Sequence, residues 1–558
     1  MHTSRGDVYR LASCVERFES TLRGWSDSNA TDRLWGRDTS LWTGADEDRW
    51  LDWLTAVDRH RPEIDQIRSL AREVRDDGIT DCLLLGMGGS SLCPEVVSET
   101  FGPQPQAARL HVLDSTLPDQ VRRLRDSLDL AHTLVVVASK SGSTVEPNVL
   151  LDYFEAELSK VVDVPGRHIA AVTDPGSALE ARAAEGDFRS VLAGVPQIGG
   201  RFSALSNFGI LPAGLAGVDL NGYLDHAGDM TEACRGVSEN PGVLLGAALG
   251  AAYHEGRDKV TLVVSPRLWE MGAWIEQLLA ESTGKVGVGL CPVNQEPVLD
   301  VTSYGSDRVF TYIRLASEPE DAQDAFIDSL SRAGHPTITL SVEDVERLGA
   351  EFYRWEFAVA VAGSLMEINP FDQPNVQESK EITSALLAGF EADGALNEPA
   401  AVGDCGGLSV TTTVPGDSPE RALAEILSSI RVGDYLALSA YCDRTDEAQA
   451  TFQRIRKQIG TTRRVATTLG YGPRFLHSTG QLHKGGPNTG VFLQVTTSPD
   501  EDLAIPGKSA TFGILSRAQA LGDYQALSEK GRRVIRFDMR EGLTAGLHAL
   551  ESWIMGSL

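Results

Sequence analysis

The run Thr133-Leu-Val-Val-Val-Ala138, followed at once by Ser139-Lys-Ser-Gly-Ser-Thr-Val-Glu146, decides the fold of this sequence. Six apolar or β-branched residues without alternation are typical of a strand buried on both faces, and the polar residues after them indicate where it ends. Similar runs begin near Cys82, Leu110 and His168, and segments of helical length separate them. Short apolar strands that alternate with helices predict a parallel sheet covered by helices on both faces.

Two further series of the same kind follow along the chain. The second begins with the apolar run Lys259–Val264, and a linker rich in Gly, Ala and Asp, around Glu391–Gly407, precedes the third. The strands expected in the third series are Tyr435–Ala440, Arg464–Thr468, Gly490–Thr496 and Arg533–Phe537. We therefore predict an α/β protein, an αβα sandwich with two parallel-sheet domains and a third, C-terminal α/β domain. The predicted boundaries are an N-terminal helical segment (1–79), a first domain (80–240), a second domain (241–395) and the C-terminal domain (408–558).

Composition excludes several classes of function. The chain has 558 residues, and 78 acidic against 50 basic side chains give a net charge of -28, which would repel nucleic acid and anionic membranes. Its seven cysteines are scattered and form no Cys-x-x-Cys pair, so they predict neither a disulfide framework nor a zinc site. Met1–Cys14 has no apolar core of a secretory signal, and Val243–Tyr253 is too short to cross a bilayer. We expect a cytoplasmic protein.

Two glycine- and hydroxyl-rich turns could bind an anion. Leu85-Gly-Met-Gly-Gly-Ser-Ser-Leu92 joins a strand to a helix, where glycines allow close backbone approach and free N–H groups attract negative charge. It lacks the last glycine of a dinucleotide fingerprint, and a purely structural turn is the alternative. In Ser139–Glu146, hydroxyls and one ammonium crowd a strand-to-helix turn. Helix capping would explain one or two of these hydroxyls, whereas a phosphate monoester would use them all.

Two other motifs contain a single charged residue each. Gly199-Gly-Arg-Phe-Ser-Ala-Leu-Ser206 places Arg201 after a flexible turn, where it is either a surface residue or a cation next to a ligand. Trp274–Lys285 places Glu281 near the end of an apolar helix. A glutamate there is usually solvated, but its neighbours Leu278 to Ala280 would partly desolvate it, which suits a general base.

These motifs, together with Asn369-Pro-Phe-Asp-Gln-Pro-Asn-Val-Gln-Glu-Ser-Lys380, occur in the order found in phosphoglucose isomerases, which the chain resembles from about Thr80 to Lys380. The chain is most similar to the isomerase part of bifunctional transaldolase/phosphoglucose isomerase proteins, because it shares their segments at Trp35–Trp42 and His477–Gly486. Since no transaldolase portion precedes the isomerase-like region, the resemblance suggests a functional partnership with a separate transaldolase.

The resemblance implies sugar-isomerase (SIS) type domains and an aldose-ketose isomerase of glycolysis and gluconeogenesis. Such an enzyme interconverts glucose 6-phosphate and fructose 6-phosphate by ring opening and a cis-enediolate, without cofactor or metal, and is a candidate homodimer. Glu281 would move the proton between C2 and C1, Arg201 would stabilise the enediolate, and Gln373 and Lys380 would lie near the ring end. The residues that would bind the sugar phosphate are Gly89, Ser90, Ser139, Lys140, Ser141, Ser143 and Thr144.

One departure from the family concerns the residue that opens the ring. The family has a histidine between the glutamate and the lysine, but this interval contains Tyr304–Phe310 without one, and His335 lacks the expected context. Leu476-His-Ser-Thr-Gly-Gln481 resembles the family's histidine segment, so we predict that His477 opens the ring, with Lys484 as its local alternative. An ordinary turn or a metal pair with His483 is the other reading, although positions six apart on a helix do not share a face.

Three alternatives to this function stay open from the sequence. The substrate could be another 6-substituted hexose, or the protein could be a non-catalytic regulator that binds a sugar phosphate. The presence of both Glu281 and Arg201 argues against the regulator. A sugar-phosphate aminotransferase has a related isomerase half, but it would need a glutamine-hydrolysing domain that residues 1–80 do not supply.

Overall fold

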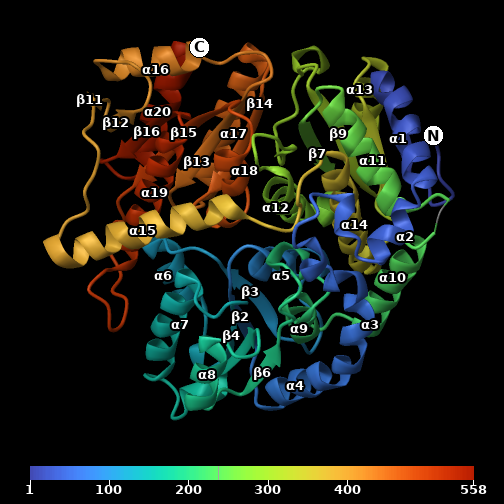
Figure 1. Cartoon of the computed structure of the whole chain (residues 1–558). Helices are drawn as coiled ribbons and strands as arrows, with labels where there is room; N and C mark the ends of the chain where they lie inside the picture. The colour runs from blue at the N-terminus through green and yellow to red at the C-terminus, as the bar shows by residue number, and fades with distance from the viewer. Residues whose placement is uncertain (237) are drawn as a thin grey trace.

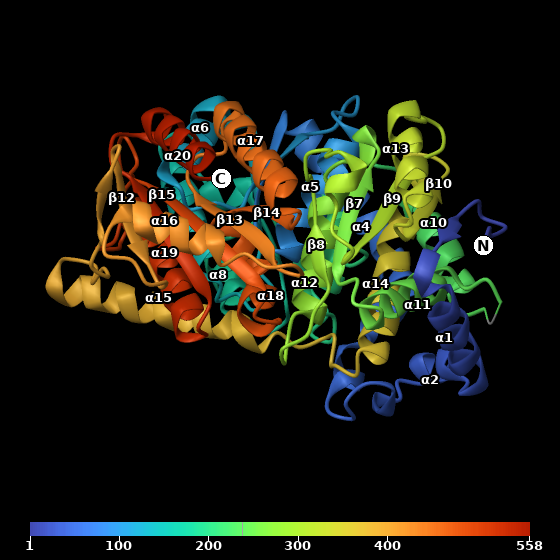
Figure 2. The ribbon, with the colours of Figure 1, turned by 90° about the horizontal axis from the view of Figure 1, so that it is seen from above.

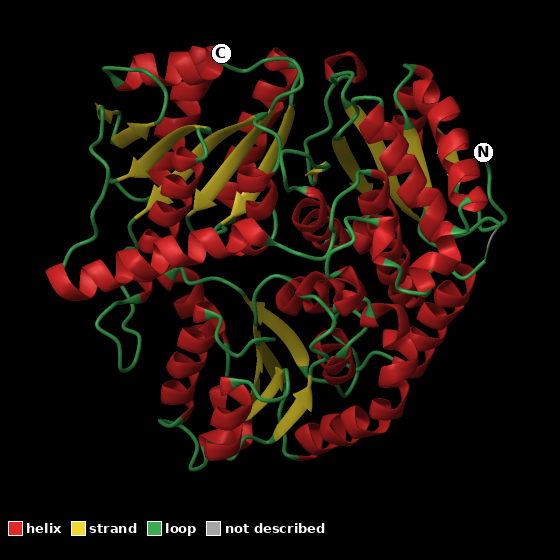
Figure 3. Cartoon of the chain, viewed as in Figure 1, coloured by secondary structure: helices red, strands yellow, loops and turns green. Residues whose placement is uncertain are grey.

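The computed structural model describes residues 1–236 and 238–558, in which three sheets are each packed against helices (Figures 1 and 3). The first sheet has the strand order β3-β2-β4-β5-β6, and every pair in it is parallel. Its strands are β2 (Asp81–Leu85), β3 (Arg109–Leu113), β4 (Thr133–Ala138), β5 (Ile169–Thr173) and β6 (Ser190–Ala193), and its helices include α5 (Gly89–Phe101), α6 (Pro118–Ser127), α7 (Val145–Leu158) and α8 (Ala178–Glu185). Every residue of β4 is buried, as the unbroken apolar run predicts.

The second sheet has the order β1-β10-β9-β7-β8. Its strands are β1 (Val8–Arg10), β7 (Lys259–Val264), β8 (Cys291–Val293), β9 (Arg308–Leu315) and β10 (Thr337–Val342). Four of these strands are parallel, and β1 adds an antiparallel edge. The segment predicted to be helical, residues 1–79, therefore also contains a strand of the second sheet; three residues are too few for hydrophobic periodicity to indicate it.

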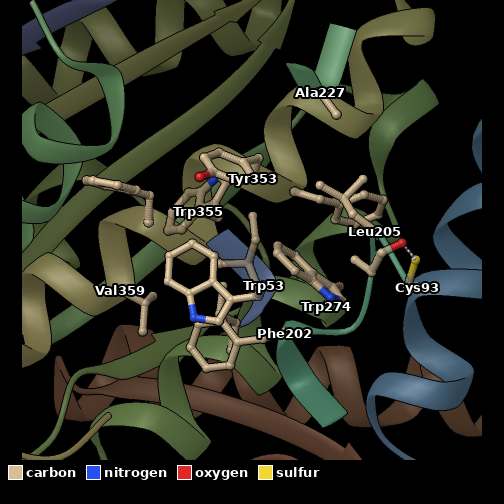
Figure 4. Close-up of a cluster of buried hydrophobic side chains, with 14 of the residues drawn as sticks. Trp53, Cys93, Phe202, Leu205, Ala227, Trp274, Tyr353, Trp355 and Val359 are labelled. Carbon is tan, nitrogen blue, oxygen red and sulfur yellow. Dashed lines mark hydrogen bonds between the residues drawn. The ribbon is translucent and has the colours of Figure 1, made fainter. Parts of the chain in front are cut away.

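Helices of the second unit and of the N-terminal segment enclose a large apolar core. The helices α10 (Leu220–Ala233), α11 (Pro241–His254), α12 (Met271–Thr283) and α14 (Leu348–Leu365) contribute to it. Helices α11 and α14 approach closely at Gly246, which has no side chain. A Cβ atom there would lie only 2.5 Å from the carbonyl oxygen of Ala358. Figure 4 shows the centre of this core, where Trp53 stacks on Phe202 with ring centroids 5.5 Å apart. The aromatic packing fixes the segment that precedes and includes Phe202.

The third sheet confirms the predicted C-terminal α/β unit. It has the order β11-β12-β16-β15-β13-β14, in which β16, β15, β13 and β14 are parallel and the other two strands form an antiparallel edge. Its strands are β11 (Gly403–Cys405), β12 (Leu408–Thr412), β13 (Tyr435–Tyr441), β14 (Ala466–Tyr471), β15 (Gly490–Thr497) and β16 (Arg533–Met539). Its helices are α16 (Pro419–Ser428), α17 (Asp446–Arg463), α18 (Gly480–Gly485), α19 (Phe512–Glu529) and α20 (Leu543–Ser557).

A long helix, α15 (Pro374–Asp393), joins the second unit to the third. It packs along α19 and α18, and its far end lies at the edge of the molecule (Figures 1 and 2). The predicted linker at Glu391–Gly407 is therefore shorter than expected, because α15 continues to Asp393 and β11 begins at Gly403. Gly394 ends the helix in the left-handed conformation, with φ of +74°.

Among residues 1–236 and 238–558, no cluster of three or more His, Cys, Asp or Glu side chains is placed to hold a metal ion. Within the same ranges, no helix combines the length and the apolar character that crossing a membrane requires. All seven cysteines are free thiols, and Cys405 is the least buried of them.

Candidate active site

Glycines bring two loops of the first unit together at the start of α5. Gly88 has φ of +57°, and Gly89 is the first residue of the helix. A Cβ atom at Gly89 would lie 1.9 Å from the carbonyl oxygen of Gly200, so a side chain there would displace the loop that carries Arg201. Ser90 follows in the first turn of α5 and is buried. The glycines are needed for the close approach of two backbones, which is consistent with the structural-turn reading and leaves anion binding here a prediction.

Arg201 lies in a short 3₁₀ helix, Gly200–Phe202, and its side chain is 1% exposed. Its guanidinium is fully engaged: Nε donates to Ser282 Oγ (2.7 Å), Nη1 to Gln373 Oε1 (2.9 Å) and Nη2 to the carbonyl oxygens of Pro370 (2.7 Å) and Asp372 (3.0 Å). Burial lowers the pKa of Arg201, and nearby Glu281 and Asp372 oppose that shift. A guanidinium stays charged under these conditions, so the site contains a fixed cation.

Glu281 faces this cation from near the end of α12. Its Oε1 lies 3.3 Å from Arg201 Nη1, and the residue is 8% exposed. The other carboxylate oxygen accepts a hydrogen bond from Gln277 Nε2 at 3.1 Å, one helical turn earlier. The predicted partial desolvation of this glutamate is therefore present, and its two oxygens have different partners.

The histidine segment of the third unit lies next to Glu281 in the same chain. The amide of Gln277 that binds Glu281 also donates to the backbone oxygen of His477 at 2.9 Å. A Cβ atom at Gly88 would lie 3.3 Å from the Cβ atom of His477. Segments of the first, second and third units thus meet at Gln277 and Gly88 within one chain.

His477 has a buried carboxylate partner that the sequence analysis did not assign. Its Nε2 lies 3.0 Å from Oε1 of Glu146, the last residue of the Ser139–Glu146 motif. Gln519 of α19 donates to the same oxygen at 2.7 Å, and Thr116 Oγ1 donates to Gln519 Oε1 at 2.7 Å. Burial raises the pKa of Glu146, but His477 and Lys380 outweigh it and hold the pKa below its ordinary value. The sequence signal for Glu146 is its position in the Ser139–Glu146 motif. No local sequence pattern indicates that Gln519 belongs to the site.

The hydroxyl loop after β4 is arranged to receive an anion. Ser139 Oγ is buried and has no hydrogen-bond partner among the described residues. Ser141 Oγ and Ser143 Oγ lie 2.9 Å apart around Gly142, which has φ of +67°. Thr144 occupies the N-cap position of α7, but its side chain makes no capping hydrogen bond. The capping alternative therefore does not explain Thr144.

Lys140 differs from the expectation that it contacts the phosphate. Its Nζ donates to Asp174 Oδ2 at 2.6 Å and to the carbonyl oxygen of Val195 at 2.7 Å. These partners follow the neighbouring strands β5 and β6. Lys140 thus ties the hydroxyl loop to the adjacent loops, since its ammonium already has a carboxylate and a carbonyl as partners.

A cavity of about 250 Å³ opens beside the hydroxyl loop. Lys380 of α15 lines it together with Ser143, Thr144 and His477, whereas Gln373 is held against Arg201, and neither Arg201 nor Glu281 is among its described lining residues. The further lining residues are Val145, Glu146, Val376, Gln377, Ser379, Thr383, Ser384, Leu387, Leu476, Leu515 and Gln519. Hydroxyls, an ammonium and an imidazole thus surround one space of sugar-phosphate size.

The local alternatives to His477 lie elsewhere. Lys484 Nζ is buried in an ion pair with Asp523 Oδ1 at 2.7 Å. His483 packs against Phe492 with ring centroids 5.0 Å apart, and burial lowers its pKa well below the ordinary value. His335 packs against Phe310. These three residues serve the packing of their own units.

A second lysine, Lys285, supports the loop that binds Arg201. Its Nζ donates to Asp372 Oδ1 at 2.6 Å, and Arg201 Nη2 donates to the backbone oxygen of the same residue. Burial and the nearby Arg201 lower the pKa of Lys285 to about 8. Lys285 ends the Trp274–Lys285 motif, but nothing in the sequence around it predicts these contacts.

The chain is similar in sequence to proteins of one known family. The family model of phosphoglucose isomerase matches residues 54–294. A glucose-6-phosphate isomerase of Synechococcus sp. (strain JA-3-3Ab) is 32% identical over 375 residues, which cover 58% of this chain and 70% of that protein. One of Rubrobacter xylanophilus is 31% identical over 381 residues, covering 59% of this chain and 87% of that protein.

Solved structures agree in fold. A hypothetical protein of Thermus thermophilus has a TM-score of 0.59 at 27% identity, over 68% of this chain and all of that one. A glucose-6-phosphate isomerase of Chlamydia trachomatis has a TM-score of 0.52 at 21% identity, over 61% of this chain and 75% of that one. With the relatives at 31–32% identity, which this chain covers over most of their length, the conclusion is that the chain belongs to the phosphoglucose isomerase family.

Proposed function

We propose that this protein interconverts glucose 6-phosphate and fructose 6-phosphate. One observation supports the assignment above all others: the Glu281 carboxylate lies between the guanidinium of Arg201, 3.3 Å away, and the amide of Gln277, which also binds the His477 backbone. A base next to a fixed cation and a histidine is the set of groups that ring opening and enolisation require.

Substrate binding and ring opening use the cavity between the hydroxyl loop and α15. The phosphate binds the loop Ser139–Thr144, where, among the described residues, the hydroxyl of Ser139 has no hydrogen-bond partner and that of Thr144 does not cap its helix. His477 donates a proton to the ring oxygen, and the Glu146 carboxylate stabilises the imidazolium from 3.0 Å. Lys380 lines the same cavity and supplies positive charge near the ring end.

The isomerisation step belongs to Glu281 and Arg201. Glu281 removes the proton from C2 of the open aldose, and the electrons move into the carbonyl to give a cis-enediolate. The guanidinium of Arg201 stabilises the negative oxygen, because its position is set by four hydrogen bonds before the charge develops. The protonated Glu281 then returns the proton to C1, and the proton of the C2 hydroxyl passes to the adjacent C1 oxygen, so that C2 becomes the ketone and C1 carries the hydroxyl. A positioned base of this kind contributes roughly 100- to 10,000-fold to the rate.

The third unit supplies His477 within one chain in this proposal. A homodimer is therefore not needed to complete the site, and it stays a prediction, as do the cytoplasmic location and the partnership with a separate transaldolase. The regulator alternative has no use for a base held against a buried arginine. Another 6-substituted hexose would share the phosphate loop, so the substrate has to be tested directly.

The test is a coupled assay of the full chain on fructose 6-phosphate, with production of glucose 6-phosphate as the readout. We expect turnover, and we expect fructose without the phosphate to be a poor substrate, since it cannot use the loop at Ser139–Thr144. Sugar-phosphate binding without turnover would support the regulator and refute the proposal. Faster turnover of a different 6-substituted hexose would mean that this hexose, and not fructose 6-phosphate, is the substrate.

A further inference from the structure

The third sheet has a strand-order reversal that the active site does not use. Strand β13 lies between β14 and β15 and pairs in parallel with both. After β13 the chain returns to the sheet as β14, on one side of the β13–β15 pair. After β15 it returns as β16, on the opposite side of that pair. The loops after β13 and β15 therefore diverge, and such a point in an open α/β sheet is where ligands bind.

A cavity of about 160 Å³ lies at this point. We call it the switch-point cavity. Tyr441 ends β13 and lines it, Thr496 and Thr497 end β15 on its other side, and the first turns of α19 form its wall. The start of α6, from the first unit, closes it. The described residues that line it are Leu117, Pro118, Asp119, Tyr441, Thr496, Thr497, Ser498, Pro499, Asp502, Gly513, Ile514, Ser516, Arg517 and Ala520.

An unsatisfied polar group points to a missing partner in this cavity. Tyr441 is 2% exposed, and its hydroxyl makes no hydrogen bond within the part of the chain that the structure describes. A buried hydroxyl without a partner is costly and uncommon, so it calls for a water or a ligand. The hydroxyls of Thr497, Ser498 and Ser516 line the same space. The cavity thus presents several groups that both donate and accept hydrogen bonds.

Charge decides which class of ligand fits. Arg517 is the cation of the described lining, and two carboxylates, Asp538 and Glu398, already pair with it. Asp119 and Asp502 line the cavity as well. A phosphate would meet carboxylates without a free cation, whereas hydroxyl groups of a neutral molecule can donate to these carboxylates and accept from Tyr441.

The cavity is connected to the proposed ring-opening histidine by two routes. The ring of Tyr441 packs edge-on against Phe475, with centroids 5.4 Å apart, and Phe475 precedes His477 by two residues in the same 3₁₀ helix. Helix α19, whose first turns line the cavity, also carries Gln519, which donates to Glu146. A ligand that orders the start of α19 and the Tyr441 ring would therefore act on the partners of His477.

We propose that the switch-point cavity binds an uncharged, polyhydroxylated small molecule of about monosaccharide size, and that occupancy changes the rate of ring opening. The binding part stands on the cavity alone. The effect on rate rests on the proposed isomerase function. Binding and rate are therefore measured separately.

The binding experiment uses the full chain and D-glucitol, an open polyol without phosphate, as the probe. Saturation-transfer NMR is recorded with fructose 6-phosphate in excess, so that the active site is occupied. We expect a saturable D-glucitol signal that Tyr441→Phe weakens roughly three- to tenfold, the loss of one hydrogen bond. Thr497→Phe, which fills the cavity, should abolish the signal. Tyr435→Phe, the same change on the same strand outside the cavity, is the control and should retain it.

Three results would overturn the binding proposal. One is the absence of a saturable D-glucitol signal in the wild type, and another is equal binding by wild type and Tyr441→Phe. The third is saturable binding of inorganic phosphate that Arg517→Gln removes, which would mean an anion site. Removing an unpartnered hydroxyl should leave the melting temperature of Tyr441→Phe unchanged or higher, so this variant tests the proposal even if Thr497→Phe does not fold.

The rate experiment follows glucose 6-phosphate turnover with and without D-glucitol. At a D-glucitol concentration near the wild-type dissociation constant, we expect a change of at least about twofold in kcat for the wild type and a smaller change for Tyr441→Phe. Saturable binding with an unchanged kcat would contradict the connection to His477 while leaving the cavity assignment intact. If the protein has no isomerase activity at all, the NMR result still decides the binding proposal.

Discussion

The two halves of the proposed site are built differently. Arg201 and Glu281 belong to the first and second units, and four hydrogen bonds hold the buried guanidinium in place. His477 comes from the third unit, its side chain is 12% exposed, and within the described part of the chain Glu146 is its one side-chain partner. In the proposed mechanism, four hydrogen bonds between the first and second units hold the half that handles the enediolate. The half that opens the ring rests on the contact between His477 of the third unit and Glu146 of the first.

The two halves also differ in whether the family model covers them. The family model ends at residue 294, so it includes Arg201, Glu281 and the hydroxyl loop but not Lys380 or His477. An oxyanion that forms during catalysis needs a cation whose position is set in advance. Ring opening needs only a proton donor at one oxygen, and different parts of a chain can supply it.

The largest expected effect tests the half that handles the enediolate. Glu281→Gln should lower kcat by about 1,000-fold or more, because the amide cannot accept the C2 proton. The KM should change by less than about tenfold, since the phosphate contacts stay. Steady-state kinetics with the exposed Glu318→Gln as a control checks this. Near-wild-type turnover in Glu281→Gln would remove Glu281 from the mechanism.

The second prediction tests the other half. His477→Ala should slow reaction of the cyclic substrate about 100-fold, since general acid catalysis at the ring oxygen is lost. An open-chain analogue that needs no ring opening should react within a few-fold of the wild-type rate. Glu146→Gln should show the same selective defect to a smaller degree, because it removes the charge beside the imidazole. Equal slowing of both substrates by His477→Ala would assign the residue to the enolisation step instead.

The third prediction concerns substrate affinity, which both halves share. The double variant Ser143→Ala, Thr144→Ala should raise KM roughly tenfold or more and lower kcat much less, because phosphate contacts are present in ground and transition states alike. Ser127→Ala, an exposed hydroxyl outside the site, is the matched control. An unchanged KM would place the phosphate elsewhere in the cleft.

The smallest expected effect concerns pH and the loop that supports Arg201. The pKa of Lys285 is about 8, so its hold on Asp372 weakens as pH rises through that value, and kcat should fall about threefold. Lys285→Gln should lack this high-pH decline, which a pH–rate profile would detect. If kcat of Lys285→Gln falls at high pH as much as that of the wild type, a group other than Lys285 causes the fall.

The effect of Lys285 on stability has the opposite sign. An unfolded lysine has a pKa of about 10.4, above the folded value of about 8. Between these values the unfolded state binds more protons, so this residue makes the free energy of unfolding rise with pH. Denaturant titrations across this window should show a smaller rise for Lys285→Gln than for the wild type.

Elements with strong local patterns were predictable from the sequence alone. The strands Thr133–Ala138 and Lys259–Val264 have the predicted bounds, because continuous apolar runs end at polar turns. The same local logic identified the hydroxyl loop and the glycine turn. It missed β1, which is too short to show a period, and the end of α15 within the expected linker.

Which of these segments meet depends on how the units pack in three dimensions. Gln277 contacts His477 across 200 residues of sequence, His477 contacts Glu146 across 331, and Gln519 contacts Glu146 across 373. The same is true of Lys140, whose partner Asp174 belongs to a different loop, and of the unpartnered hydroxyl of Tyr441. Local propensity and periodicity report on neighbours within a turn or a strand, whereas these contacts depend on how three separately patterned units pack, so no short stretch of sequence encodes them.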